Sequence, residues 1–133
     1  MKDETRLWLE YAEDNLKSSK ILVDSLLFNP SLQNAQQSIE KDMKACMVEK
    51  GLKLQKTHSI SSLVEILKKE NIIINISDDE IDVIDSIYMV SKYPFGSVLP
   101  DFEPDEKICL ECIDIAYSQA RYTKLSKPVD INK

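Results

Sequence analysis

Residues 3–27 read DETRLWLEYAEDNLKSSKILVDSLL, and this stretch restricts the fold more strongly than any other segment of the chain. Apolar side chains recur in it largely at steps of three and four residues, which is the spacing of one face of an α-helix. The predicted stripe consists of Trp8, Ala12, Leu16, Val23, Leu26 and Leu27. We therefore predict a long first helix, from about Asp3 to Leu27, with one buried face.

A second long helix is predicted directly after it. Asn29 and Pro30 are typical of a helix start, with Asn29 as the cap and proline at the first helical position. The helix should continue to Lys50, and Gly51 follows where a left-handed residue would end it. Its inner face is expected to consist of Leu32, Ala35, Ile39, Met43, Cys46 and Met47.

The middle of the chain predicts a third, shorter helix and one extended segment. The helix should begin near Ser59 and bury Leu63, Val64 and Leu67. Ile72–Ile76 is rich in β-branched residues but lacks a partner strand of comparable strength. We therefore expect this segment to be an extended connector that packs against the helices.

Two further signals mark the starts of the last two helices. Ser77 and Glu80, three residues apart before an apolar run, form a capping box that opens a fourth helix, which should end before Pro94. Pro104 is predicted to open the final helix. The expected inner faces are Ile81, Ile84, Ile87 and Tyr88 in the fourth helix, and Ile108, Cys112, Ile115, Ala116 and Ala120 in the fifth.

The composition fits one globular domain, which we place at residues 1–133. Two glycines are few for a β-rich protein of this length. Hydrophobic residues make up 43% and charged residues 30%, and the sequence contains neither an apolar run near the roughly 20 residues of a membrane span nor a secretory signal. We predict an all-α, up-and-down bundle of four to five antiparallel helices in the cytoplasm, without a membrane partner.

Four short motifs resemble the HEPN domain family. They are Trp8-Leu9-x-Tyr11-Ala12-x-x-Asn15-Leu16, Asn34-Ala35-Gln36-Gln37-Ser38-Ile39-Glu40-Lys41, Lys56-Thr57-His58-Ser59 and Ser91-Lys92-Tyr93-Pro94. The first two are similar to the opening helix pair of the family, the third to the K-T-H-D/S connector after it, and the fourth to the A-R-Y-P segment at the end of the fourth helix. The motifs follow the family's order and spacing over most of the chain.

This resemblance implies a helical bundle that often dimerises, and it implies two kinds of function. Some members are metal-independent ribonucleases and toxins that carry an R-x(4–6)-H motif. Others are noncatalytic or nucleotide-binding modules, frequently partnered with a minimal nucleotidyltransferase. We expect the second kind here, namely a noncatalytic module that binds a nucleotide or such a protein partner and forms a homodimer.

The ribonuclease motif is absent from this chain. Metal-independent RNA cleavage needs a general acid or base near neutral pH, which histidine supplies, and a cation such as arginine beside it. His58 is the only histidine, and neither Arg6 nor Arg121 stands four to six residues before it. A divergent ribonuclease that uses His58 with lysines in place of arginine is therefore the alternative from the enzyme class. A purely structural dimerisation bundle is the third hypothesis.

One segment is locally basic, although the net charge of −6 opposes nonspecific binding of RNA or DNA. Five lysines lie in the segment 41–58, which also contains Asp42 and Glu49. The predicted nucleotide or anion site consists of Lys41, Lys44, Lys56, His58, Lys92 and Tyr93. The plainer interpretations are a solvated lysine face, in which Glu40 pairs with Lys44 at i,i+4, and a histidine that only caps or packs the connector.

The segment that contains Lys92 and Tyr93 departs from the family's pattern at two positions. Lys92 replaces the arginine of the R-Y-P segment, which keeps a positive charge but loses the planar fork suited to phosphate. Phe95 follows where members often have aspartate. The alternative role for Tyr93 and Pro94 is to end the fourth helix and pack against its end.

Cys109 and Cys112 match a C-x-x-C pattern, but the pattern lies inside a predicted amphipathic helix. Redox pairs need a reactive thiolate, usually at a helix amino terminus, and structural zinc needs four ligands. We therefore predict buried thiols that act as small apolar residues, with no metal site and no cofactor.

Overall fold

The computed structural model describes the backbone of residues 1–92 and 103–131 and the side chains of residues 1–91 and 103–120. Its elements are α1 (Asp3–Asp24), α2 (Phe28–Glu49), α3 (Ile60–Lys69), α4 (Asp78–Lys92) and α5 (Glu106–Ile131). All regular structure in these residues is helical, so the predicted all-α class is confirmed. No helix in the described part of the chain combines the length and the hydropathy of a membrane span.

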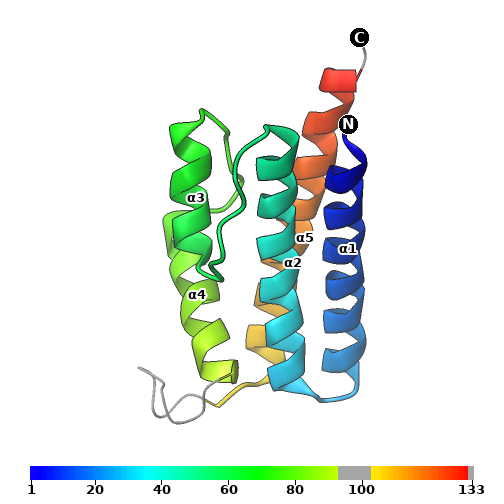
Figure 1. The fold of residues 1–133 in the computed structure, drawn as a ribbon. Helices are drawn as coiled ribbons and strands as arrows, with labels where there is room; N and C mark the ends of the chain where they lie inside the picture. Colours follow the sequence, from blue (N-terminus) through cyan, green and yellow to red (C-terminus); the bar gives the residue numbers. More distant parts are fainter. Residues whose placement is uncertain (93–102, 132–133) are drawn as a thin grey trace.

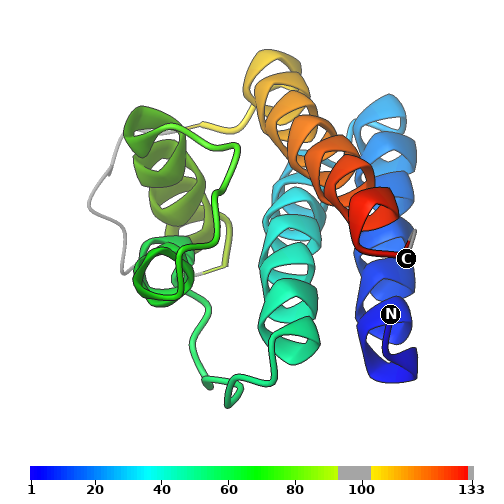
Figure 2. The same ribbon diagram turned by 90° about the horizontal axis from the view of Figure 1, so that it is seen from above.

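α2 is the central helix of the bundle and packs against α1, α3, α4 and α5. α1 and α5 cover one side of α2, and α3 and α4 cover the other (Figure 1, Figure 2). Consecutive helices alternate in direction except α2 and α3, because the connector of residues 50–59 runs back along α2 before α3 begins (Figure 1). An extended chain gains at most about 3.3–3.6 Å per residue, so a connector of this length can return over most of α2.

The core follows the buried face of α2 and the helices around it. The largest fully buried aliphatic and methionine side chains are Leu32, Ile39, Met43, Met47, Ile60, Leu63, Leu67 and Ile84. Each such side chain contributes roughly 1.5–3 kcal/mol when it leaves water. In α5, Cys112 and Ala116 are buried as predicted, and Cys109 and Ile113 are buried in addition to the predicted face.

The end of α1 differs from the prediction. α1 ends at Asp24, and Leu26 and Leu27 are 69% and 50% exposed rather than buried. Leu26 has a φ of 62°, and the N–H groups of Leu26 and Leu27 donate to the carbonyls of Val23 and Leu22. This Schellman ending turns the chain away from the helix axis, so the two leucines leave the buried stripe.

The start of α2 also differs, because the helix begins earlier than predicted, after a turn of residues 25–27. Leu27 holds the cap position and Phe28 is the first helical residue, so Asn29 lies inside the helix and Pro30 stands third in it. Proline is tolerated at this place because the N–H groups of the first turn have no partner within the helix. The sequence signal for a helix start was correct, but its position was two residues too late.

The start of α5 is the third corrected boundary. α5 begins at Glu106 rather than at Pro104. The side chain of Asp105 takes the capping role, because its Oδ1 accepts a hydrogen bond from the N–H of Ile108 at 2.9 Å. A carboxylate also suits the positive end of the helix dipole, which proline cannot exploit.

The remaining turn signals are confirmed. Gly51 has a φ of 73° and ends α2 as predicted. The capping box is formed, since the N–H of Glu80 donates to Ser77 Oγ at 3.1 Å and the N–H of Ser77 donates to Glu80 Oε1 at 2.9 Å. Ile72–Ile76 is an extended connector whose alternate isoleucines pack against the core, whereas Ile73 is 75% exposed.

Candidate anion-binding site

A buried carboxylate lies at the centre of the candidate site. Glu40, in the middle of α2, is 3% exposed. Its Oε2 accepts a hydrogen bond from Lys44 Nζ at 2.7 Å, and its Oε1 lies 3.0 Å from His58 Nδ1. Gln37 Nε2 donates to the same Oε1 at 3.3 Å. A buried charge is destabilising unless it is paired and hydrogen-bonded, and these three contacts provide both kinds of partner.

The position of His58 is fixed by its backbone as well as by its side chain. Gln36 Nε2 donates to the carbonyl oxygen of His58 at 2.7 Å, and Gln36 is itself 1% exposed. Two groups of one connector residue, the carbonyl and the imidazole of His58, are therefore tied to α2 by Gln36 and Glu40.

The residues after His58 are held from α4. Asp85 accepts hydrogen bonds from the N–H groups of Ile60 at 2.7 Å and Ser61 at 3.0 Å, and from the hydroxyl of Ser59 at 3.3 Å. Ser59 Oγ in turn accepts from the N–H of Ser62 at 3.2 Å. A carboxylate at a helix amino terminus is favourable because the dipole places positive charge there. The last residues of the connector are thus bound to α2 through His58, and the start of α3 is bound to α4 through Asp85.

The imidazole of His58 contacts Glu40 through Nδ1, and most of the ring is exposed to solvent. The side chain is 59% exposed, and its ring centroid lies 5.8 Å from that of Tyr88 on α4. When Nδ1 carries a proton and donates it to Glu40, Nε2 becomes an acceptor or a base, and in the protonated ring both nitrogens are donors. The arrangement can therefore offer either a base or a hydrogen-bond donor to a ligand.

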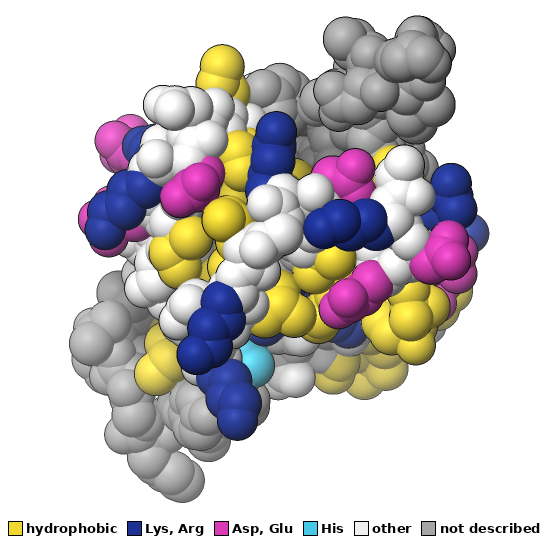
Figure 3. Space-filling view, turned by 45° about the horizontal axis from the view of Figure 1, so that its top comes forward, with side chains coloured by type: hydrophobic (Ala, Val, Ile, Leu, Met, Phe, Trp, Pro, Cys, Tyr) yellow, Lys and Arg dark blue, Asp and Glu magenta, His cyan; other side chains and the backbone are white. Residues whose placement is uncertain are grey.

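Two lysines of α2 lie against aromatic rings of α1. Lys44 Nζ is 5.8 Å from the centroid of the Trp8 ring, and Lys41 Nζ is 5.8 Å from that of Tyr11. Lys41 Nζ also donates to Asn15 Oδ1 at 2.7 Å. On the face drawn in Figure 3, basic side chains lie among acidic and apolar ones, and the cyan imidazole lies next to basic side chains.

The structure brings together two of the predicted site residues, since Lys44 and His58 both contact the Glu40 carboxylate, whereas Lys41 lies against Asn15 and Tyr11 of α1. Lys56 is exposed and stands two residues before His58 in the connector. Lys92 is the last residue of α4 and its side chain is not described, and Tyr93 lies outside the described residues.

The sequence interpretation named Glu40 only as the i,i+4 partner of Lys44, a pair that the structure contains, and it left Gln36 and Asn15 out of the predicted site. Gln36 and Glu40 are buried in α2, and Asn15 is half-buried on α1. All three stand within the motifs that resemble the HEPN family. Each of the three has polar as well as apolar neighbours three and four residues away, so the helical pattern gave no clear signal that these side chains are buried and need hydrogen-bond partners.

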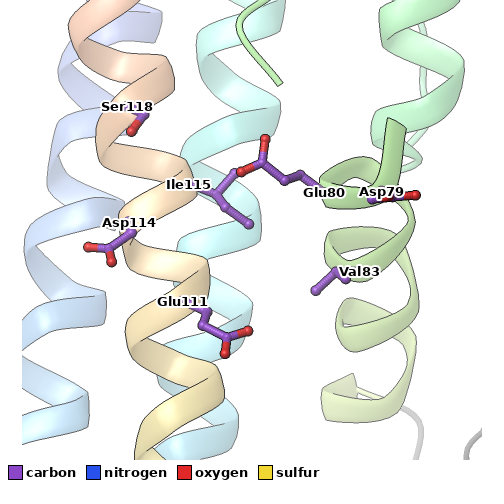
Figure 4. Close-up of a pocket in the computed structure, with 7 residues that line it drawn as sticks. All are labelled: Asp79, Glu80, Val83, Glu111, Asp114, Ile115 and Ser118. Carbon is purple, nitrogen blue, oxygen red and sulfur yellow. The ribbon is translucent and has the colours of Figure 1, made fainter. Parts of the chain in front are cut away.

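A cleft elsewhere on the bundle has the opposite charge. It has a volume of about 340 Å³, lies between α4 and α5, and carries Asp79 and Glu80 on one wall and Glu111 and Asp114 on the other (Figure 4). Four carboxylates repel an anionic ligand, so this cleft does not suit a phosphate. Among the described residues, no group of three or more His, Cys, Asp or Glu side chains is arranged to hold a metal ion.

The two cysteines of α5 are packed in the core. Cys109 is 0% and Cys112 is 1% exposed, as the prediction of small apolar residues requires. Burial raises the pKa of both thiols, that of Cys112 to about 12. Thiols that stay protonated at neutral pH are poor nucleophiles, so this C-x-x-C pattern does not form a reactive redox pair.

The fold and the polar cluster together define a small all-α bundle with a buried carboxylate on its central helix. The family model of the HEPN domain matches residues 5–124, and the chain therefore belongs to the HEPN family. This confirms the resemblance that the four motifs indicated. No curated protein sequence matches the chain.

Two solved structures are similar to most of the chain. The crystal structure of TT1696 from Thermus thermophilus has a TM-score of 0.76 and 21% sequence identity, over 92% of this chain and 98% of that chain. The crystal structure of ST0689, an archaeal HEPN homologue, has a TM-score of 0.63 and 21% identity, over 95% of this chain and 98% of that chain. At this identity the similarity concerns the fold alone.

Proposed function

We propose that the protein is a cytoplasmic, noncatalytic HEPN module that binds the phosphate groups of a nucleotide beside Glu40. The observation that carries the proposal is that one buried carboxylate holds a lysine and a histidine side by side, at 2.7 Å from Lys44 and 3.0 Å from His58. Each cation or donor keeps further hydrogens for a ligand, because an ammonium has three donors and imidazole has two nitrogens. Lys41 follows Glu40 in α2 and Lys56 stands two residues before His58, so both add positive charge to the segments that form the site.

The aromatic side chains next to the lysines support a nucleotide rather than a simple anion. Trp8 is half-buried on α1 and Tyr11 is 48% exposed. An exposed aromatic face can stack on a nucleobase, and such stacking contributes about 1–3 kcal/mol per base in nucleic-acid complexes. Phosphate contacts to the lysines and base contacts to the rings would then act together.

Nucleotide titration followed by tryptophan fluorescence tests this proposal, because Trp8 is the single tryptophan and lies beside Lys44. We expect ATP to change the emission, and we expect the substitutions Lys41→Ala and Lys56→Ala each to weaken binding by roughly fivefold through the loss of one nearby charge. Lys69→Ala, at the exposed end of α3, is the matched control and should bind as the unchanged protein does. Equal affinity in all four proteins, or no response to any nucleotide, would rule out the site.

The proposal includes a homodimer and a protein partner of the minimal nucleotidyltransferase class, which the family resemblance implies. Exposed apolar side chains on α1 support a protein interface, since Leu7 is 46%, Tyr11 is 48% and Ile21 is 65% exposed. Light scattering of the purified protein tests the dimer. A monomer at all accessible concentrations would remove this part of the proposal and leave nucleotide binding to be judged by fluorescence.

A divergent ribonuclease is the second candidate, and one observation favours it. His58 Nδ1 faces a buried carboxylate while the ring is largely exposed, which is how a carboxylate orients an imidazole that acts as a general base. RNA cleavage in the presence of a chelator that is lost in His58→Ala and Glu40→Gln, but not in Lys69→Ala, would establish this activity. Residual cleavage that is the same in all of these proteins would indicate a contaminating nuclease.

A further inference from the structure

We infer that protonation of His58 controls the affinity of the candidate site for anions, an inference that rests on the proposed function. The two oxygens of the Glu40 carboxylate are divided between two basic partners. Oε2 lies 2.7 Å from Lys44 Nζ, and Oε1 lies 3.0 Å from His58 Nδ1. Lys44 and His58 therefore share the single negative charge of Glu40, whose side chain is 4% exposed.

The charge balance of the cluster changes when the imidazole takes up a proton. With a neutral ring, His58 gives Glu40 a hydrogen bond but no charge, and Lys44 alone neutralises the carboxylate. With a protonated ring, His58 forms the ion pair, and the positive charge of Lys44 is in excess. An anion that approaches Lys44 and the exposed edge of the ring is then attracted by one more unit of charge.

The other charged and titratable groups around the ring do not cancel this effect. Tyr88 packs against it from α4, with the two ring centroids 5.8 Å apart. Asp85, also on α4, directs its carboxylate at the N–H groups that begin α3, at 2.7 and 3.0 Å, so that its charge faces the helix dipole. Lys56 is exposed in the connector two residues away and adds further attraction for an anion. Glu40 is therefore the acidic group that lies directly against the imidazole.

Sulfate is the probe for the test, because its charge is constant over the pH range in which histidine titrates. Sulfate binding to the full chain is measured by NMR chemical shifts at pH 5.5 and pH 8.0, at constant ionic strength. We expect affinity at pH 5.5 to be roughly threefold to tenfold higher, the effect of one added charge about 5 Å away in a largely aqueous setting. In His58→Gln, which keeps a donor for Glu40 but cannot gain a charge, affinity should be equal at the two pH values.

A second measurement uses the unchanged protein and therefore does not depend on whether His58→Gln folds. Because linkage is symmetrical, bound sulfate must make the imidazole of the unchanged protein hold its proton to higher pH. The NMR titration of the single histidine, with and without saturating sulfate, reports this directly. Sulfate binding with equal affinity at both pH values, or an unmoved imidazole titration, would overturn the inference while leaving the proposed site intact. Failure of both sulfate and ATP to bind at either pH would instead overturn the proposed function, and this inference with it.

Discussion

Glu40 and His58 stand 18 residues apart in sequence, and their side chains meet at 3.0 Å between Oε1 and Nδ1. The contact joins the central helix α2 to the connector that runs back along it. Because α3 begins two residues after His58, the same contact fixes where the second half of the bundle starts relative to the first. A single polar pair therefore serves both the candidate site and the fold.

Glu40→Gln should destabilise the protein. The substitution removes the charge that Lys44 and His58 share, and the Lys44 side chain, which is 12% exposed, is left without its ion pair. Losing a partner of a largely buried charge costs more than an average surface change, so we expect a loss of about 1–3 kcal/mol in the free energy of unfolding. Urea unfolding measures this. Glu10→Gln, at an exposed position of α1, is the matched control and should change stability by less than about 0.5 kcal/mol.

Asp85→Ala should loosen the start of α3. The carboxylate accepts from two backbone N–H groups and one hydroxyl at the amino end of that helix, and α3 has only 10 residues. Removal of a helix cap costs about 0.5–2 kcal/mol, and we expect the upper part of that range here because Ile60 is fully buried beside it. Asp82→Ala removes an exposed carboxylate one turn earlier in α4. Equal stability of the two variants would show that the Asp85 contacts contribute nothing measurable.

Leu26→Gly should stabilise the protein, which is unusual for a change of leucine to glycine. Leu26 has a φ of 62° and is 69% exposed, so it carries the strain of a left-handed residue and buries little. Relief of that strain, about 1–2 kcal/mol, exceeds the greater chain entropy of glycine, about 0.5–1 kcal/mol. The expected gain is about 0.5–1 kcal/mol in a thermal or urea unfolding experiment.

Ser25→Gly tests the reason for that gain. Ser25 precedes Leu26 and has a φ of −92°, where glycine offers no relief of strain. The variant should lose about 0.5–1 kcal/mol. If both glycine variants change stability in the same direction, backbone strain at Leu26 is not the cause.

Features that depend on neighbouring residues in the sequence could be predicted, and features that depend on the path of the chain could not. Ser77 and Glu80 meet because a helix start brings residues three apart together, and Glu40 pairs with Lys44 for the same reason at a spacing of four. Leu26 was misassigned because the apolar spacing of α1 continues through it, although the helix has already ended. The apolar pattern contains no signal for a left-handed leucine.

The contact between Glu40 and His58 belongs to the second kind. It exists because the connector runs back along α2 instead of leading directly to an antiparallel α3, and no local motif specifies that path. The family resemblance marked both residues, yet it did not show that they touch. The lysines of the predicted site were found from their charge, whereas the residues that position them are buried and had to be read from the structure.

The acid stability of the protein should depend on Glu49, the last residue of α2. Burial raises the pKa of this carboxyl, but hydrogen bonds from the N–H of Lys2 at 3.2 Å and the hydroxyl of Thr5 at 2.9 Å lower it, and the net result is a pKa below the ordinary value of 4.5. A carboxyl whose pKa is lowered by folding stabilises the native state fully at pH values above its unfolded pKa. That contribution is lost as the pH falls through the lower, folded value.

The free energy of unfolding of Glu49→Gln, measured against that of the unchanged protein at pH 7 and at pH 3, tests this dependence. Glu49→Gln should be less stable at pH 7, because the contacts that tie the amino terminus to α2 are weakened. The difference between the two proteins should shrink as the pH is lowered to 3, because the carboxyl takes up a proton more readily in the unfolded state than in the folded one. Glu65→Gln, at an exposed position of α3, serves as the control and should be as stable as the unchanged protein at both pH values. If the difference for Glu49→Gln is the same at pH 7 and pH 3, the negative charge of Glu49 does not contribute to the stability of the native state, and the prediction is wrong.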